Sequence, residues 1–338
     1  MKVSFCVTYY NQKDFVRQSM DSILALEKPC DWEILVGDDG SSDGTIEVVK
    51  EYMAQYPENI FLYVMDREQG KKYEIVRRAS ANRMNLLDHM TGDYFCFMDG
   101  DDRYCNTSFV TEALDYFHKD PDLTLVGFGY ETFNDKDGVL GRFALPAGLL
   151  DAETYLSKGL FTHCGACVLK NIMTADYRAF LHHVGYYDDN NIVSANLAKG
   201  KLYISETIIY AYRQIEGSTF HAMNLAEVSV LNAQSYDVDL ALLPNHADAL
   251  LLRYSTAILN TYFLRYRLPK LLGQDKYNIY LHGCSQLDNS LSYLLLQNDR
   301  SKTAKKRISE TVGKLIKLHP KLALRLFLAS FEIPLSCA

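Results

Sequence analysis

Short apolar runs alternate with stretches of helical periodicity from residue 2 to about residue 129. The runs, each long enough for a strand, lie at residues 3–7, 33–36, 60–65, 93–98 and 123–128. Between them, apolar side chains recur at helical spacing at residues 15–24 and 46–53. Strands that alternate with helices are typical of βαβ units. The pattern therefore predicts an α/β fold with a mostly parallel central sheet.

The pattern changes twice further along the chain. Residues 134–146 are rich in turn formers, and strand-like runs at 201–204 and 208–212 follow a helix that ends near residue 199. Beyond about residue 219, long apolar-periodic stretches with few strand signals take over, at 225–243, 247–265, 276–296 and 307–318. We therefore expect two domains, an α/β domain over residues 1–219 and a helical region over residues 220–338.

The net charge of −7 is unevenly distributed. Between residues 302 and 338, eight Lys and Arg residues stand against two Glu residues, which gives +6 and leaves −13 upstream. An acidic body of this kind is not expected to bind nucleic acid. The tail at residues 302–331 is basic and partly apolar, so we expect it to lie on an anionic membrane surface. Packing on the body or in a dimer interface is the alternative.

Composition narrows the class of protein further. With 338 residues and 48% apolar content, the chain can build a large core, which argues against disorder. Residues 1–7 already have the pattern of a strand, and no run of about 18 apolar residues occurs, so neither a secretory leader nor a spanning helix is expected. The eight cysteines are then expected to be reduced, in a cytoplasmic protein that is peripheral on the inner face of the cytoplasmic membrane if its tail binds lipid.

Two acidic clusters follow directly on apolar runs. Asp38 and Asp39 end the second run, and Asp99, Asp101 and Asp102 end the fourth. Open α/β sheets bind ligands at the carboxyl ends of their strands. Carboxylates gathered there repel one another unless a cation or hydrogen-bond donors share the site. Several oxygen ligands on one short loop suit Mg²⁺ or Mn²⁺ when phosphates complete the shell, so the clusters predict a metal-bridged phosphate ligand.

The loop that follows Asp39 suggests what else the ligand carries. It is rich in Gly and Ser and enters a predicted helix at residues 40–45. Carboxylates in such a place accept hydrogen bonds from base N–H groups and sugar hydroxyls, so the loop suits a nucleobase or a ribose. The alternatives are capping of the helix by Ser42 or Asp43 and, for residues 99–102, an acidic turn that is merely solvated.

Taken together, these segments resemble family 2 of the inverting glycosyltransferases, which have the GT-A, Rossmann-like nucleotide-sugar-binding fold. The motif Asp-Asp-Gly-Ser-Ser-Asp-Gly-Thr occupies residues 38–45, and Asp-Gly-Asp-Asp occupies residues 99–102. The likeness covers about the first 220 residues in the family's order, at residues 3–11, 18–24, 38–45, 92–94, 99–102, 187–192 and 212–219. The resemblance implies a GT-A glycosyltransferase domain at residues 1–219, followed by a helical appendage.

The resemblance also implies roles for individual residues. Those that would bind the donor are Thr8, Tyr10, Asp38, Asp39, Asn82, Asp99 and Asp101. Asp99 would lie near the ribose, and Asp101, together with Asp102, would hold the metal on the pyrophosphate. Asp189 would be the base that takes the proton from an acceptor hydroxyl. The family usually has Glu-Asp where this chain has Asp188 and Asp189, so either residue can be the base, and the spacing favours Asp189.

Three further residues are expected on the acceptor side, namely His163, Cys164 and Arg213. Cys164 also forms a C-x-x-C with Cys167, which makes a redox or zinc site an alternative. A purely structural role is another alternative for His163. The basic segment at residues 77–83 either contacts phosphate or forms a solvated helix face.

The sequence thus predicts a metal-dependent, inverting glycosyltransferase that uses Mn²⁺ or Mg²⁺. The expected donor is a UDP-sugar, and the expected acceptor is a hydroxyl of a glycan or lipid-linked glycan of the bacterial surface. A haloacid-dehalogenase-like phosphatase is one alternative, because a strand that ends in Asp-x-Asp also describes its nucleophile. A non-catalytic module that binds a nucleotide or a glycan is the other.

Overall fold

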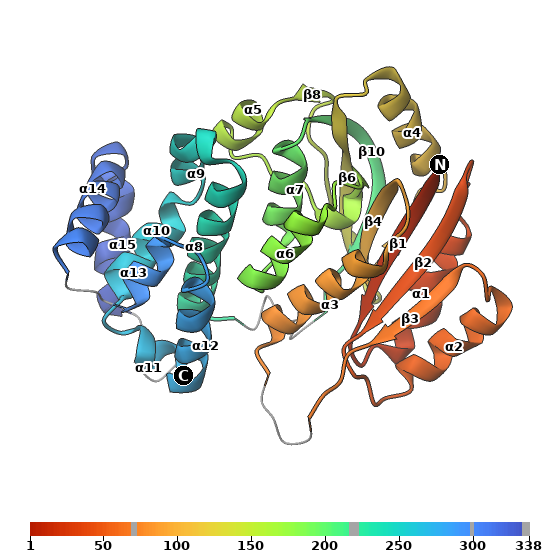
Figure 1. Cartoon of the computed structure of the whole chain (residues 1–338), viewed down its shortest axis with the longest axis horizontal. Helices are drawn as coiled ribbons and strands as arrows, with labels where there is room; N and C mark the ends of the chain where they lie inside the picture. The colour runs from red at the N-terminus through yellow and green to blue at the C-terminus, as the bar shows by residue number, and fades with distance from the viewer. Residues whose placement is uncertain (69–72, 216–222, 298–300, 333–338) are drawn as a thin grey trace. The chain divides into compact units, whose positions relative to one another are not determined.

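The computed structural model describes residues 1–68, 73–215, 223–297 and 301–332, and it divides into two compact units (Figure 1). The first unit comprises Met1–Tyr155 and Leu160–Ser218, and the second comprises Leu156–Gly159 and Thr219–Ala338. The domain boundary expected at residue 219 and the 216–219 end of the last motif lie outside the described residues.

The first unit is built on one mixed sheet. Its order is β3-β2-β1-β4-β9-β6-β10-β5, with β7 paired to β6 and β8 paired to β10. Within the described residues the strands are β1 (Lys2–Tyr9), β2 (Asp31–Asp38), β3 (Ile60–Val64), β4 (Tyr94–Asp99), β5 (Arg103–Tyr104), β6 (Leu123–Asn134), β7 (Gly138–Phe143), β8 (Gly148–Leu150), β9 (Cys167–Lys170) and β10 (Lys201–Arg213). Strands β3, β2, β1 and β4 are parallel, as are β6 and β10, whereas β9 is antiparallel to both of its neighbours. The predicted α/β fold is confirmed.

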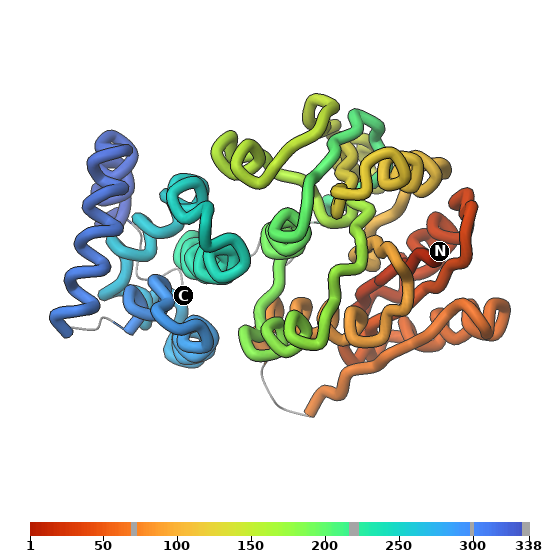
Figure 2. The backbone as a smooth tube through the Cα atoms, turned by 45° about the horizontal axis from the view of Figure 1, so that its top comes forward, coloured from red at the N-terminus to blue at the C-terminus, as the bar shows by residue number. Residues whose placement is uncertain are grey.

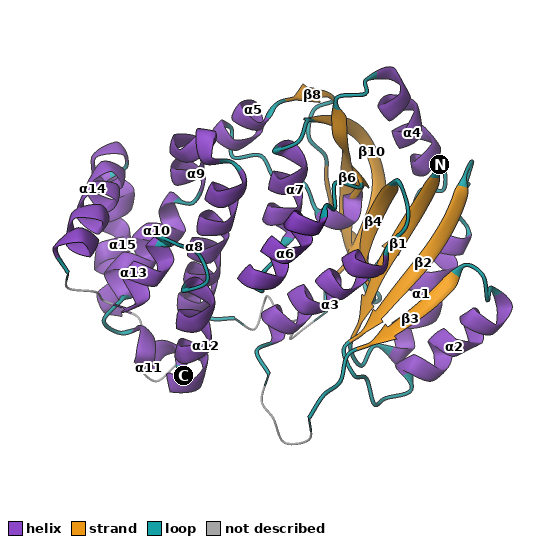
Figure 3. Ribbon diagram, viewed as in Figure 1, coloured by secondary structure: helices purple, strands orange, loops and turns teal. Residues whose placement is uncertain are grey.

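Helices cover both faces of this sheet (Figure 3). They are α1 (Lys13–Leu24), α2 (Thr45–Gln55), α3 (Ile75–His89), α4 (Phe109–Lys119), α6 (Ala175–Val184) and α7 (Asp189–Leu197), and α5 (Ala152–Ser157) has residues of both units. Alternate residues of a strand point to opposite faces. The face that includes Phe5 of β1 packs with α1, α2 and α4 in one buried cluster, through Met20, Val49 and Phe109. Helix α3 contacts β1 and β2 from the other side.

Two predicted segments have a different structure. Residues 134–146 contain β7, which pairs antiparallel with β6, because the turn formers at 135–138 close a hairpin instead of leaving the sheet. The separate runs at 201–204 and 208–212 belong to one strand, β10, whose pairing with β6 shifts register between Ile204 and Ile208. A bulged strand looks like two strands in sequence because the irregular residues break the period-2 pattern.

The second unit is helical, as predicted (Figure 2). Its described helices are α8 (Leu225–Leu242), α9 (Ala247–Arg253), α10 (Ser255–Leu264), α11 (Leu268–Leu272), α12 (Gln274–Cys284), α13 (Leu291–Gln297), α14 (Lys302–Leu318) and α15 (Pro320–Glu332). Pro320 occupies the first position of α15, where its missing N–H is not needed. Among the described residues, every helix is too short or too polar to cross a membrane.

Candidate active site

Sheet register brings the two acidic clusters together at the end of β1. Strand β1 lies between β2 and β4. Thr8 pairs with Gly37 of β2 on one side and with Asp99 of β4 on the other, and Tyr9 pairs with Asp38. The Thr8 hydroxyl donates a hydrogen bond to Asp99 at 3.2 Å. The carboxyl ends of these three parallel strands therefore form one site, where open α/β sheets bind ligands.

Asp39 and Tyr10 lie at one side of this site, joined by arginines. Asp39 is buried and forms ion pairs with both Arg67 and Arg78, and Arg78 Nε lies 2.6 Å from its carboxylate. The Arg67 guanidinium also stacks on the Tyr10 ring at 3.8 Å from its centroid, and residue Tyr10 is 42% exposed. A flat, exposed aromatic ring beside a carboxylate suits a nucleobase, which offers both a face and N–H donors.

Asp38 and Asn82 lie beneath that surface. Asp38 accepts a hydrogen bond from Ser41 N at 2.7 Å, and Asn82 donates one to Gly37 O at 2.9 Å. Each side chain is buried and leaves one oxygen without a hydrogen-bond partner in the described part of the chain. Burial raises the pKa of Asp38. Both residues therefore support the loop after β2 from within the fold. Because they are buried, they can act on a ligand only by positioning this loop.

The loop that enters α2 is pinned by side chains at both of its ends. Asp43 accepts from Thr45 N and from Lys13 N, each at 3.0 Å, so it takes up a free N–H of the helix start. Ser42 instead donates its own N–H to Asn11 at 2.9 Å. The N-cap of α2 is Gly44, without a side-chain cap hydrogen bond, so neither Ser42 nor Asp43 is the cap and Asp43 contacts only the first N–H of the helix.

The three carboxylates of residues 99–102 have very different surroundings. Asp102 is fully buried, where its two oxygens accept from Tyr210 OH at 2.6 Å and from Arg213 N at 2.7 Å. Arg213 Nε also donates to Asp101 O at 2.7 Å. Gly100 is required because a Cβ there would overlap the Tyr9 ring. Asp102 thus anchors the loop to β10, and its role as a metal ligand stays a prediction.

Asp101 is the carboxylate of the loop that has the fewest hydrogen-bond donors among the described residues. Burial, together with the charge of Asp99, raises its pKa to about 6, although Arg213 and the Gln12 side chain act in the opposite direction. A cation bound beside Asp101 would offset the repulsion between its carboxylate and that of Asp99. The donor set of Asp101 and Asp99 consists of hard oxygens and therefore fits Mg²⁺ or Mn²⁺.

Arg83 connects the donor side of the site to the proposed base. It lies on α3 with a side chain only 12% exposed, and it places NH2 3.2 Å from Asp99 and NH1 3.2 Å from Asp189. From its sequence, the segment at residues 77–83 is expected only to contact phosphate or to form a solvated helix face. The one available signal was a run of arginines close to Asn82, and this does not reveal which carboxylates they meet.

The adjacent carboxylates of Asp188 and Asp189 have separate tasks. Asp188 is the N-cap of α7, where it accepts from Asn191 N at 3.0 Å and from Tyr186 OH at 2.9 Å. Asp189 begins the helix with its side chain 25% exposed. Burial would raise the pKa of Asp189, but the positive charge of Arg83, His163 and the hydrogen bonds from Cys164 together outweigh it and hold this pKa below its usual value. The geometry favours Asp189 over Asp188 as the group that can meet an acceptor.

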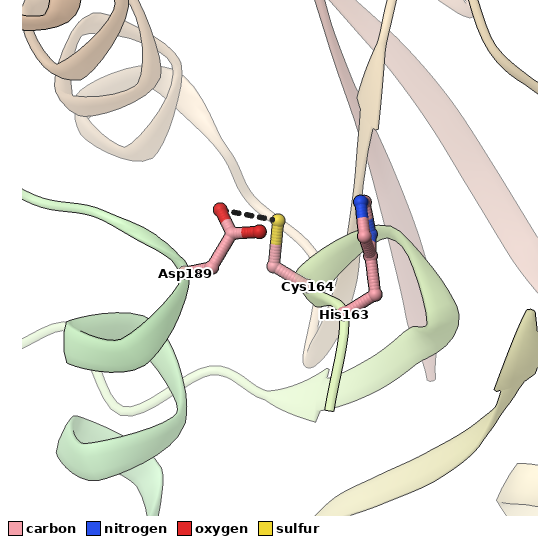
Figure 4. Close-up of side chains that lie close together, drawn as sticks. All are labelled: His163, Cys164 and Asp189. Carbon is pink, nitrogen blue, oxygen red and sulfur yellow. Dashed lines mark hydrogen bonds between the residues drawn. The ribbon is translucent and has the colours of Figure 1, made fainter. Parts of the chain in front are cut away.

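His163 and Cys164 lie next to Asp189 (Figure 4). The Cys164 thiol donates to Asp189 at 3.1 Å, and His163 Nδ1 accepts from Gly165 N at 3.1 Å. Ligand atoms of these three residues lie within 4.8 Å of one another, close enough for a metal ion. We assign no metal there, because Arg83 already pairs with Asp189 and burial raises the pKa of the Cys164 thiol far above its usual value.

The remaining acceptor-side candidates have structural surroundings. The His163 ring packs 5.0 Å from Tyr210 and 5.2 Å from Tyr212, and burial lowers its pKa. Arg213 is 3% exposed and lies over the rings of Phe15 and Phe133. Both side chains brace the floor of the site, so contact with an acceptor stays a prediction for them. Cys164 and Cys167 are both free thiols.

A family model described as glycosyl transferase family 2 matches residues 4–174. The chain therefore belongs to glycosyl transferase family 2, as its resemblance predicted. It is 34% identical over 149 residues to the putative glycosyltransferase EpsE of Bacillus subtilis, which covers 43% of this chain and 49% of that one. It is 26% identical over 208 residues to the poly-beta-1,6-N-acetyl-D-glucosamine synthase of Staphylococcus epidermidis, covering 60% and 46%. The chain thus spans about half the length of these curated relatives.

Solved structures share the fold. The crystal structure of S. aureus TarS 1–349 in complex with UDP superposes with a TM-score of 0.59 at 13% identity, covering 98% of this chain and 89% of that one. The same protein in complex with UDP-GlcNAc also has a TM-score of 0.59, at 14% identity. At this level of identity the likeness concerns the fold alone, and it agrees with the predicted GT-A architecture followed by helices.

Proposed function

We propose that this chain is an inverting glycosyltransferase that moves a sugar from a nucleotide-sugar donor to a hydroxyl of a glycan. Family membership supports the class of reaction. The observation that carries the proposal is the position of Arg83, which is ion-paired to Asp99 and to Asp189 at once. Through it, the strand end that would hold the donor and the carboxylate that would receive a proton belong to one charge network.

The donor's nucleoside is assigned to the side of the site formed by Tyr10 and Asp39, with Thr8 and Asp99 nearest the ribose. Tyr10 is 42% exposed with Arg67 stacked on its ring, and the Asp39 carboxylate is held in place by two arginines. UDP is the first nucleotide to test, since a protein of the same fold has been solved in complex with it.

Asp101 and Asp99 would hold Mg²⁺ or Mn²⁺ against the diphosphate. When bound, such an ion neutralises the charge that develops on the departing nucleoside diphosphate. The chain contributes the orientation of these carboxylates, because Asp102 and Arg213 fasten the loop to β10. Asp189 would take the proton from the acceptor hydroxyl, and its lowered pKa keeps it ionised at neutral pH.

The test separates chemistry from binding. Asp189→Asn is expected to retain nucleotide binding in calorimetry and to lose sugar transfer, and retained transfer would refute the base assignment. Asp188→Asn is the matched control: Asn caps a helix about as well as Asp, so this variant is expected to keep α7 folded and to keep transfer.

Calorimetric titration of UDP, GDP, dTDP and CMP, with Mn²⁺ and with chelator, tests the donor and the ion. Metal-dependent binding of one nucleotide supports the proposal, whereas no binding to any of them favours a non-catalytic module. Release of phosphate from aryl phosphates would instead favour the phosphatase, which family membership does not support.

The acceptor is proposed to be a glycan or lipid-linked glycan made at the inner face of the cytoplasmic membrane. The name of one relative, a poly-beta-1,6-N-acetyl-D-glucosamine synthase, supports a glycan as the acceptor. Membrane-derived acceptor lipid is the direct test: transfer of radiolabelled sugar into a lipid extract supports a lipid-linked acceptor, and transfer only into a free oligosaccharide argues against it.

A further inference from the structure

The last described helix, α15, has two unlike faces. Its buried residues, Ala323, Leu326 and Ser330, include two small side chains. Its large apolar side chains are mostly exposed and lie at positions i, i+3, i+4 and i+7 of the helix. We call them the α15 apolar face: Leu324, Phe327, Leu328 and Phe331, which are 59%, 43%, 53% and 69% exposed. A helix that only packed on its own unit would have the larger apolar side chains on the buried face.

This surface is concentrated and ordered. Of the 19 large apolar side chains that are exposed in the described residues, six lie between Ile316 and Phe331. The ring of Phe327 lies 5.0 Å from that of Phe331 and 5.5 Å from that of Phe263 on α10, so aromatic packing holds part of the face in place. Contiguous exposed apolar surface of this kind marks an interaction site, whereas scattered single residues do not.

Positive charge borders the same face. Lys321 and Arg325 precede Leu324 and Leu328 by three residues, so they are neighbours of these side chains on the helix surface. Neither has an ion-pair partner in the described part of the chain, unlike Lys314 of α14, which pairs with Asp248. Residues 301–332 together carry eight Lys and Arg residues and only two Glu residues.

We propose that the α15 apolar face inserts into the headgroup region of a membrane rich in anionic phospholipid, with α15 lying in the membrane plane. Apolar side chains on one face and bases at its edge are the features by which interfacial helices bind. A second copy of this chain fits less well, because a two-fold contact of this face with itself would bring two basic edges together. The proposal rests on the second unit and does not depend on the transferase reaction.

Co-sedimentation of the full chain with vesicles, without nucleotide or metal, tests the proposal. The vesicles are phosphatidylcholine alone or a mixture with phosphatidylglycerol. Wild type is expected to partition onto the anionic vesicles, and Leu328→Ser combined with Phe331→Ser is expected to reduce the partition coefficient at least tenfold. The matched control is Val139→Ser with Leu140→Ser on β7, whose side chains are 47% and 50% exposed and which should leave partitioning unchanged.

A charge variant separates the electrostatic part. Lys321→Gln with Arg325→Gln is expected to weaken binding to anionic vesicles by roughly 30-fold, at about 1 kcal/mol per base near the surface, and to change binding to phosphatidylcholine little. Circular dichroism of each variant checks that the helices remain folded.

Two results would overturn the proposal. One is that wild type and the Leu328→Ser, Phe331→Ser variant have equal partition coefficients, or that the β7 control lowers the partition coefficient as much as this variant does. The other is that wild type does not bind vesicles and is a dimer in light scattering, whereas this variant is a monomer. That result would assign the α15 apolar face to a second copy. Because no donor is present, a failure here leaves the proposed transferase function untouched, and the reverse also holds.

Discussion

Replacing Asp101 by Asn is expected to stabilise the metal-free protein at neutral pH. In the folded chain, burial and the neighbouring Asp99 raise the pKa of Asp101 to about 6, from an ordinary value of 3.8. That difference corresponds to about 3 kcal/mol of disfavoured ionisation, because one pKa unit is about 1.4 kcal/mol. Solvent that reaches the site screens part of it, so we expect a gain of between about 1 and 3 kcal/mol in the free energy of unfolding.

The pH dependence has a definite sign. Below pH 3.8 the Asp101 carboxyl is protonated in both the folded and the unfolded chain, so the group costs nothing. As pH rises from 3.8 to about 6, the unfolded chain releases the proton before the folded chain does, and stability falls. Above about pH 6 the loss is complete. Wild type should therefore lose stability relative to Asp101→Asn across this window and remain at a constant difference above it.

Tryptophan fluorescence gives the assay. Trp32, on β2, is the chain's one tryptophan, so its signal in urea reports on the unit that carries the site. The control is Asp99→Asn, which should destabilise, because Asp99 accepts from Thr8 and pairs with the mostly buried Arg83. Mn²⁺ should raise the urea midpoint of wild type and not that of Asp101→Asn. If Asp101→Asn is no more stable than wild type at pH 7.5 in chelator, the electrostatic reasoning is wrong.

Three further predictions follow from the same geometry. Gly100→Ala should lower the free energy of unfolding by about 1 to 3 kcal/mol, because the new Cβ overlaps Tyr9, and urea midpoints measure it. Arg83→Met should raise the pKa of Asp189 and reduce transfer at least about tenfold. In a rate profile between pH 4 and 9, the acidic limb should shift to higher pH. A limb at the same pH as in wild type would contradict the role of the ion pair. Because the pKa of Asp189 is lowered in the folded chain, its stabilising contribution is present at neutral pH and lost as pH falls through the acidic range, and Asp189→Asn should abolish that slope.

The strands and the two acidic clusters could be predicted from sequence because both depend on local pattern. An apolar run that stops at Asp38 or at Asp99 has a strand's length and a strand's end. Since parallel strands present their carboxyl ends at one edge, the meeting of the clusters beside Thr8 needed only the order of the strands. The family resemblance predicted the donor-binding residues in addition.

The charge network could not be predicted, because it depends on where α3 lies over the sheet. Nothing near Arg83 in sequence indicates that it reaches Asp99 and Asp189, which are 16 and 106 residues away. The same holds for Asp102, which stands beside Asp101 in the chain but is satisfied by Tyr210 and Arg213 of β10. Which of two adjacent carboxylates is anchored and which is free is decided by a strand that arrives about 110 residues later.

The contrast between those two neighbours is the strongest physical argument for a cation at this site. In an acidic turn that served only solubility, each carboxylate would be exposed to water. Here Asp102 is locked by two hydrogen bonds and Gly100 is pressed against Tyr9, so the backbone holds Asp101 where burial and Asp99 both oppose its charge. Folding alone would be served better by an uncharged side chain at position 101. A positive ligand that offsets the repulsion gives this carboxylate a function. Comparing the stability of wild type and Asp101→Asn without Mn²⁺ measures the cost of the charge, and comparing them with Mn²⁺ measures the stabilisation by the ion.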